Sequence, residues 1–162
     1  MRDQVALTPL LVLALACSAL RGPPPEEQIS SALADLAAGG FSFEADVRFR
    51  ANRYGACDGV ACADLALIRE RRTILLAPDA FDSPAWLRAS LLEIWERYRR
   101  PRPGSVPDLA RGTLRVMRDG PRVGVDDPQL LRLAHRSYRR LYASLPPEKR
   151  ADLPDPAGLP LP

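Results

Sequence analysis

The clearest pattern in the chain is a strict alternation of apolar and polar residues in FSFEADVRF, from Phe41 to Phe49. Such alternation predicts a β-strand with one face on a core and the other in solvent, as in an antiparallel sheet. A second apolar run, Thr73 to Ala77, also predicts a strand. The run before it, Leu65 to Ile68, fits either a strand or a helical turn.

Residues Thr113 to Val125, TLRVMRDGPRVGV, predict a β-hairpin that turns at Asp119-Gly120. The preceding PRPGSVPD is typical of a loop. Together the strands predict a small antiparallel sheet of about four to five strands. Its expected inner face consists of Phe41, Phe43, Val47, Phe49, Ile74, Leu114, Val116, Val123 and Val125.

Three other segments carry apolar residues at helical spacing. Ser83-Pro84 supplies an N-cap and a first-turn proline for a helix over residues 84–100, and Asp127-Pro128 does so for a helix over 128–145. A shorter helix over 26–38 ends at two glycines. The fold class is therefore α+β, with two main helices and one short N-terminal helix packed on the sheet.

The ends of the chain differ from this domain. Residues 1–16 form an expected signal peptide, 17–25 a proline-rich tether, 26–145 a single α+β domain and 146–162 a proline-rich extended tail. The apolar part of the leader, VALTPLLVLALA, is shorter than the roughly 20 residues that a membrane-spanning helix needs. It fits the apolar core of an export signal, and Ala14-Leu15-Ala16 supplies small residues for cleavage before Cys17.

The stretch Leu13-Ala14-Leu15-Ala16-Cys17 resembles the lipobox of bacterial lipoproteins. In that family the cysteine after the cleavage site carries fatty acyl groups such as palmitate. Leucine usually stands three residues before that cysteine, where this chain has Ala14. Ser18 resembles the residue found in lipoproteins sorted to an outer membrane. The resemblance implies a lipid-anchored protein of the cell envelope facing the periplasm. Ordinary secretory cleavage would instead give a soluble periplasmic or secreted protein.

Cysteine usage agrees with export. The chain has three cysteines, and an odd cysteine in an exported protein needs an explanation. Cys57 and Cys62 lie close together and would form a disulfide in an oxidising compartment, which leaves Cys17 for lipidation. Their spacing also suits zinc, but a structural zinc site needs four ligands, and the chain has one histidine, His135. No metal or other cofactor is expected.

Charge adds little to this assignment. The net charge is +3, and Lys149 is the only lysine among 23 basic residues. Arginines cluster over residues 97–102 and 132–140, but Glu93 and Glu96 stand four residues before arginines and can pair with them on a solvated helix face. Nucleic acid is not an expected partner of an exported protein.

No catalytic residue can be assigned. Nucleophilic catalysis needs a base near the nucleophile, and His135 lies at the border between an apolar stripe and an arginine face, where a ring usually packs. Glu44 and Asp46 share the solvent face of one strand, which could form a carboxylate pair for glycosidic chemistry or simply be solvated. His135, Glu93 and Glu96 are the weak candidates for a polar site.

The strand TILLAPDAF followed by the helix SPAWLRASLLEIWERY is similar in layout to the core of zinc metallopeptidases. In those enzymes the helix carries H-E-x-x-H, with two zinc-binding histidines and a glutamate base. Glu93 matches that glutamate, whereas Leu92 and Glu96 stand in place of the histidines. The resemblance implies a non-catalytic relic of such a domain.

The sequence thus predicts an exported, membrane-tethered lipoprotein that acts as a binding or assembly module in the cell envelope, without catalysis. The expected partners are the membrane, through the lipid anchor, and an envelope protein. A metallopeptidase-like relic and an exported enzyme with an unidentified site are the alternatives.

Overall fold

The computed structural model describes residues 22–100 and 104–160. The predicted signal peptide and Cys17 lie outside this range. Within it, no helix combines the length and the apolar character needed to cross a membrane.

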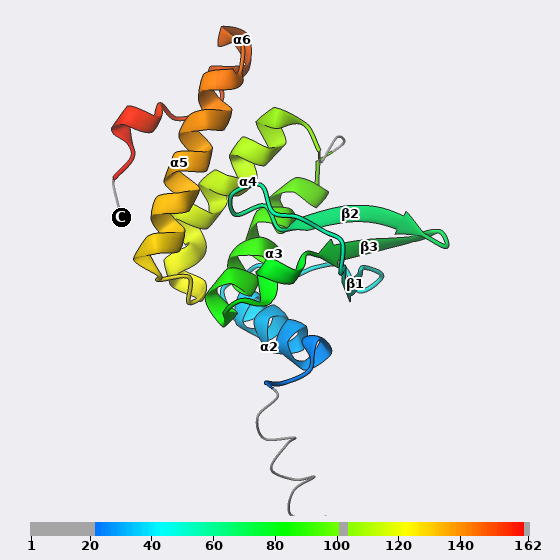
Figure 1. The fold of residues 1–162 in the computed structure, drawn as a ribbon. Helices are drawn as coiled ribbons and strands as arrows, with labels where there is room; N and C mark the ends of the chain where they lie inside the picture. Colours follow the sequence, from blue (N-terminus) through cyan, green and yellow to red (C-terminus); the bar gives the residue numbers. More distant parts are fainter. Residues whose placement is uncertain (1–21, 101–103, 161–162) are drawn as a thin grey trace, which may run out of the picture.

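The described chain is α+β, with a small sheet beside a group of helices (Figure 1). The sheet lies on one side of helix α3, and α4 and α5 follow on the other side, with α2 packed across one end of α3 (Figure 1). The α-helices and strands are α2 (Pro25–Ala38), β1 (Arg48–Ala51), β2 (Ala63–Ile68), β3 (Arg71–Leu76), α3 (Pro84–Tyr98), α4 (Val106–Asp119), α5 (Pro128–Ser144) and α6 (Pro147–Arg150). Three short 3₁₀ helices are η1 (Pro78–Phe81), η2 (Gly120–Val123) and η3 (Pro156–Gly158).

Helix α3 is the central element of the domain. It begins at the predicted cap, where the Ser83 hydroxyl accepts a hydrogen bond from the amide of Trp86 at 3.2 Å. The helix packs against α2, α4 and β2 and therefore buries far more than one stripe. Its buried residues are Leu87, Ala89, Ser90, Leu91, Leu92, Glu93, Ile94, Glu96, Arg97 and Tyr98. The sequence pattern predicted the helix but not that it is surrounded.

The sheet has three strands in the order β1-β3-β2 and is mixed, since β1 runs parallel to β3 and β2 antiparallel to it. The prediction of four to five antiparallel strands was therefore wrong, although the α+β class is correct. Phe49, Leu65 and Ile74 share one face through their pairing, and Ile74 is fully buried on it. Leu65 to Ile68, which fitted a strand or a helical turn, belongs to β2.

The alternating segment FSFEADVRF is a strand only from Arg48 onward. Before it the backbone turns, and the amide of Val47 donates to the carbonyl of Glu44 at 3.1 Å. The carboxylates of Glu44 and Asp46 both bind the guanidinium of Arg72 on β3. The alternation still describes most of the burial, with Phe41 and Val47 in the core. Local ion pairing, rather than a sheet ladder, holds the segment against β3.

The predicted hairpin over residues 113–125 was wrong, because this segment forms the last part of α4 followed by η2. The helix begins inside the expected loop: the Ser105 hydroxyl accepts from the amide of Asp108 at 3.4 Å. Asp119-Gly120 ends the helix rather than turning a hairpin. The predicted sheet residues Leu114, Val116, Val123 and Val125 are all buried, but none is on a strand: the first two lie in α4, Val123 in η2 and Val125 in the loop before α5.

The proline-rich segment after residue 145 is folded and is not the extended tail that was predicted. It forms α6 and η3 and returns along α5 (Figure 1). The Tyr138 hydroxyl donates to the carbonyl of Pro154 at 2.7 Å, and Leu153 is 7% exposed. Proline excludes long helices here but does not prevent the segment from packing on α5.

The structure contains the predicted disulfide between Cys57 and Cys62, in the loop that joins β1 to β2. The tip of this loop contacts α5. Gly59 adopts a positive φ of 63° and lies so close to Ser137 that a Cβ there would collide with its side chain. Asp58 forms an ion pair with Arg140. The disulfide loop therefore connects the sheet to α5.

The turn between β2 and β3 is a strained one. It contains two residues, Arg69 and Glu70, with φ of 48° and 64°. A two-residue hairpin with two positive φ angles favours Asn-Gly, since other side chains crowd the backbone in this conformation. The unfavourable turn residues explain why the sequence did not reveal the hairpin.

We expect the double substitution Arg69→Asn with Glu70→Gly to increase the free energy of unfolding by about 1–2 kcal/mol, because it relieves this strain. Equilibrium urea denaturation measures the change. The double alanine variant at the same positions removes the same charges but keeps the positive φ, and it should give no such gain. An equal gain from both variants would show that charge, not backbone conformation, is responsible.

Candidate functional site

The three polar candidates from the sequence lie in separate surroundings. Glu93 is inside the domain on α3. Glu96, on the same helix, pairs with Arg100 just after α3 and with Arg115 on α4, and His135 lines a cleft beside α5. The structure does not bring them together into one pocket.

Glu93 is completely buried and pairs with Arg97 one turn later, with Oε1 and Nε 2.8 Å apart. The Arg97 guanidinium also donates to the carbonyl of Ala63, the first residue of β2. Helix α4 approaches closely at Gly112, where a Cβ would lie 2.5 Å from Oε1 of Glu93. Because Glu93 has no exposed surface, a substrate cannot reach its carboxyl group.

Burial raises the pKa of Glu93 to about 8, while the neighbouring Arg97 acts in the opposite direction. Within the described residues, Oε2 of Glu93 has no hydrogen-bond partner. A carboxyl group in such a place favours its neutral form because the charged form loses its hydration. The raised pKa therefore reflects a buried structural position and not a catalytic acid.

The pKa of Glu96 is shifted in the opposite direction from that of Glu93. Burial alone would raise its pKa, but hydrogen bonds from Arg100 and Arg115 lower the pKa below its ordinary value. The distances from its two oxygens to these guanidinium groups are 2.6 and 2.8 Å. Arg115 continues to Asp119 at 2.6 Å, so Glu96 links α3 to α4 through a chain of ion pairs.

The metallopeptidase-like positions show no metal-binding arrangement. Leu92 and Glu93 are buried, and Glu96 is engaged by arginines. Across residues 22–100 and 104–160, no three His, Cys, Asp or Glu side chains gather in a way that could hold a metal ion.

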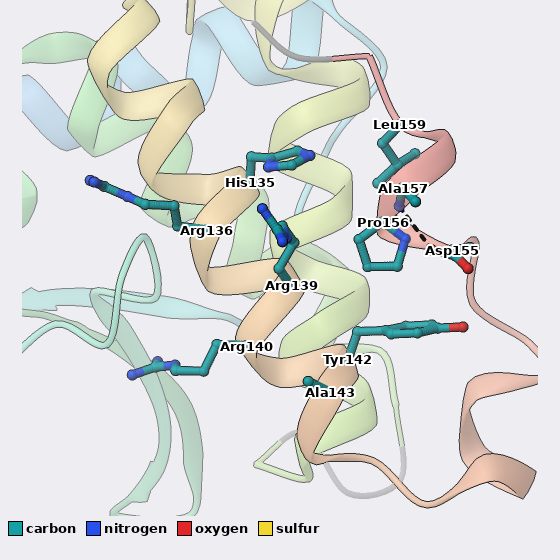
Figure 2. Close-up of a pocket in the computed structure, with 10 residues that line it drawn as sticks. All are labelled: His135, Arg136, Arg139, Arg140, Tyr142, Ala143, Asp155, Pro156, Ala157 and Leu159. Carbon is teal, nitrogen blue, oxygen red and sulfur yellow. Dashed lines mark hydrogen bonds between the residues drawn. The ribbon is translucent and has the colours of Figure 1, made fainter.

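A cleft of about 720 Å³ lies beside α5, between this helix and the segment around η3 (Figure 2). It is a groove open to solvent and combines cationic and apolar groups. The residues that line it are His135, Arg136, Arg139, Arg140, Tyr142, Ala143, Asp155, Pro156, Ala157 and Leu159.

The side chains of the cleft divide into two groups (Figure 2). His135 and Tyr142 extend from α5 toward the C-terminal segment, and the Arg139 guanidinium points toward His135. Arg136 and Arg140 extend from the other side of the helix, where Arg140 pairs with Asp58. Among the described residues Arg139 has no ion pair, so its charge is not neutralised by the protein.

The opposite wall of the cleft is mostly apolar. Pro156 and Leu159 lie across the cleft from α5, with Leu159 nearer to His135 and Pro156 nearer to Tyr142. The guanidinium of Arg150 lies 5.4 Å from the centre of the Tyr142 ring. Asp155 contributes the carboxylate on this wall, and its Oδ1 accepts a hydrogen bond from the amide of Ala157 at 2.8 Å. Asp155 is therefore occupied in capping η3.

Sequence reasoning placed His135 at the border of the apolar stripe and the arginine face, and in the structure this residue is 6% exposed. It did not find the cleft, because the opposite wall comes from a segment expected to be extended. A comparison with protein-family models, curated proteins and solved structures finds no match for this chain.

The raised pKa of Glu93 predicts a pH dependence of stability. The folded state holds a proton on Glu93 that the unfolded state releases above a pH of about 4.5, so the stabilisation is complete below that pH and is lost as the pH rises through about 8. The free energy of unfolding should therefore fall between pH 5 and pH 8.5 more steeply in the wild type than in Glu93→Gln. Urea denaturation at several pH values measures both slopes.

The exposed Glu148 provides a matched control, since Glu148→Gln removes one carboxyl group without changing the interior. This variant should keep the wild-type slope. Parallel slopes for the wild type and Glu93→Gln would mean that Glu93 is ionised in the folded protein at neutral pH.

Proposed function

We propose that the chain is an exported, lipid-tethered protein that works as a binding module in the cell envelope, and that the cleft beside α5 is its binding site. The first part extends the sequence prediction at Cys17. The second part depends on the geometry of residues 128–160.

Two features support export and tethering. The Cys57–Cys62 disulfide suits an oxidising compartment outside the cytoplasm. The first described helix begins at Pro25, the last residue of the expected tether. The short segment between Cys17 and this helix would hold the domain close to a membrane surface.

The observation that carries the binding role is the combination of an unneutralised guanidinium with an apolar wall in one open groove. Arg139 faces this groove, while the carboxylates of α3 are committed to contacts with arginines that join secondary-structure elements. A groove of about 720 Å³ lies within the range of roughly 300–1,000 Å³ that is typical of small-molecule sites. Binding is therefore the activity that these residues support best.

Lipid tethering predicts that Cys17→Ala moves the protein from the membrane fraction to the soluble fraction of the expressing cell. Two or more acyl chains anchor a protein stably in a membrane, whereas the unacylated protein lacks this source of membrane affinity. Cell fractionation with immunoblotting, and the intact mass of the mature protein, measure the outcome.

The double variant Cys57→Ala with Cys62→Ala is the control, because it removes two cysteines and retains Cys17. It should remain in the membrane fraction. If Cys17→Ala also remains there, lipid anchoring at Cys17 is wrong.

A further inference from the structure

We infer that Arg139 and His135 form the polar end of a site for a phosphate-bearing ligand, whose apolar part packs against Tyr142, Pro156 and Leu159. This inference assigns a ligand class to the binding cleft and so rests on the proposed function.

The charge of the cleft favours an anion. Arg136 and Arg139 lie within one helical turn and have no ion pair among the described residues, and the guanidinium of Arg139 points toward His135 in the cleft. Asp58 neutralises Arg140 through their ion pair. Asp155 lies on the facing wall with its Oδ1 bound to the amide of Ala157, so its single carboxylate faces the two arginines that have no ion pair among the described residues. The guanidinium of Arg139 thus offers donors that the described protein does not use.

His135 adds a second polar group beside Arg139 in the cleft. Its ring is 6% exposed, and its Nε2 is buried without a hydrogen-bond partner among the described residues. Buried polar atoms nearly always have partners, so an unpartnered one beside a groove indicates a group that acquires its contact on binding or after a small ring movement. An exposed surface arginine alone would not provide this feature.

Phosphate fits these donors well. The planar guanidinium binds two phosphate oxygens with parallel N–H donors, and an imidazole N–H can donate to a third. The facing wall supplies Pro156 and Leu159 beside the single carboxylate of Asp155, and Tyr142 adds an aromatic ring from α5. The ligand should therefore combine a phosphate with an apolar group, as in a soluble phosphate monoester or a phospholipid headgroup with its first acyl carbons.

The test uses the full chain with Cys17→Ala, so that no acyl group carries the protein to lipid. Isothermal titration calorimetry would compare dihexanoyl phosphatidic acid, dihexanoyl phosphatidylcholine and inorganic phosphate as probes. We expect the phosphatidic acid to bind most tightly, because only this probe offers both a phosphate monoester and apolar chains. Equal affinity for the two lipids would overturn the role of the anionic group, and equal affinity for inorganic phosphate would overturn the role of the apolar wall.

Variants then locate the site. Arg139→Gln should weaken binding of the phosphatidic acid at least about tenfold, which is the expected loss of one charge-assisted hydrogen bond. His135→Gln should weaken it as well, and Arg139→Lys should retain part of the affinity. Arg132→Gln is the matched control, since Arg132 is exposed on the same helix but lies outside the cleft, and it should bind like the parent. Equal losses in Arg132→Gln and Arg139→Gln would overturn the assignment.

Circular dichroism and the thermal midpoint of each variant show that it is folded. Co-sedimentation with phosphatidylcholine vesicles containing phosphatidic acid separates the two sources of phosphate. Arg139-dependent capture by the vesicles supports a membrane lipid, and binding of the dissolved lipid alone supports a soluble ester.

These measurements use purified protein and do not depend on cellular location. A failure here therefore leaves the tether intact, and a failure of the Cys17 experiment leaves the cleft intact.

Discussion

The contact between Glu93 and Arg97 is the constraint around which this small domain is built. Both residues lie on the buried part of α3, where Nε of Arg97 is 2.8 Å from Oε1 of Glu93, and each offsets part of the cost of burying the other's polar group. Through Arg97 the pair binds the carbonyl of Ala63 at the start of β2, and beside Glu93 the backbone of Gly112 brings α4 into close contact. One polar contact thus aligns the sheet, α3 and α4.

The remaining elements extend from this centre. Glu96 joins α3 to α4 a second time through Arg115, and α5 packs along α4. The disulfide loop reaches α5 at Ser137, and the C-terminal segment is held there by Tyr138. The cleft is therefore formed at the outer layer of the domain, on a helix that is fixed from both sides. Such support holds the Arg139 backbone in place while its side chain remains exposed.

Local signals in the sequence predicted several elements well. The N-caps at Ser83 and Asp127 gave the starts of α3 and α5, and two nearby cysteines gave the disulfide. The failures also have physical reasons. Asp119-Gly120 favours a hairpin turn only when strands flank it, and here the Ser105 cap with Asp108 three residues later had already begun a helix. The β2–β3 turn escaped detection because it uses Arg69 and Glu70 in place of Asn-Gly.

The candidate site was less predictable than the fold. Helical spacing could place His135 beside the arginines, but the apolar wall at Pro156 and Leu159 depends on a long-range contact that no periodicity indicates. Likewise, Glu93 resembled a surface partner of Arg97 at four-residue spacing, and only the packing of α4 shows that both are buried. The four-residue spacing in the sequence shows that Glu93 and Arg97 can pair, but only the tertiary structure shows that the pair lies in the interior and joins three elements.

A double-mutant cycle on Glu93 and Arg97 tests the central role of this pair most directly. Urea denaturation would give the free energies of unfolding of the wild type, Glu93→Leu, Arg97→Met and the double variant. If the pair organises the interior, each single change removes one side of this buried contact while the other side stays buried, and the double variant should recover about 1–3 kcal/mol relative to the sum of the two losses. Additive losses, with no recovery in the double variant, would contradict the account.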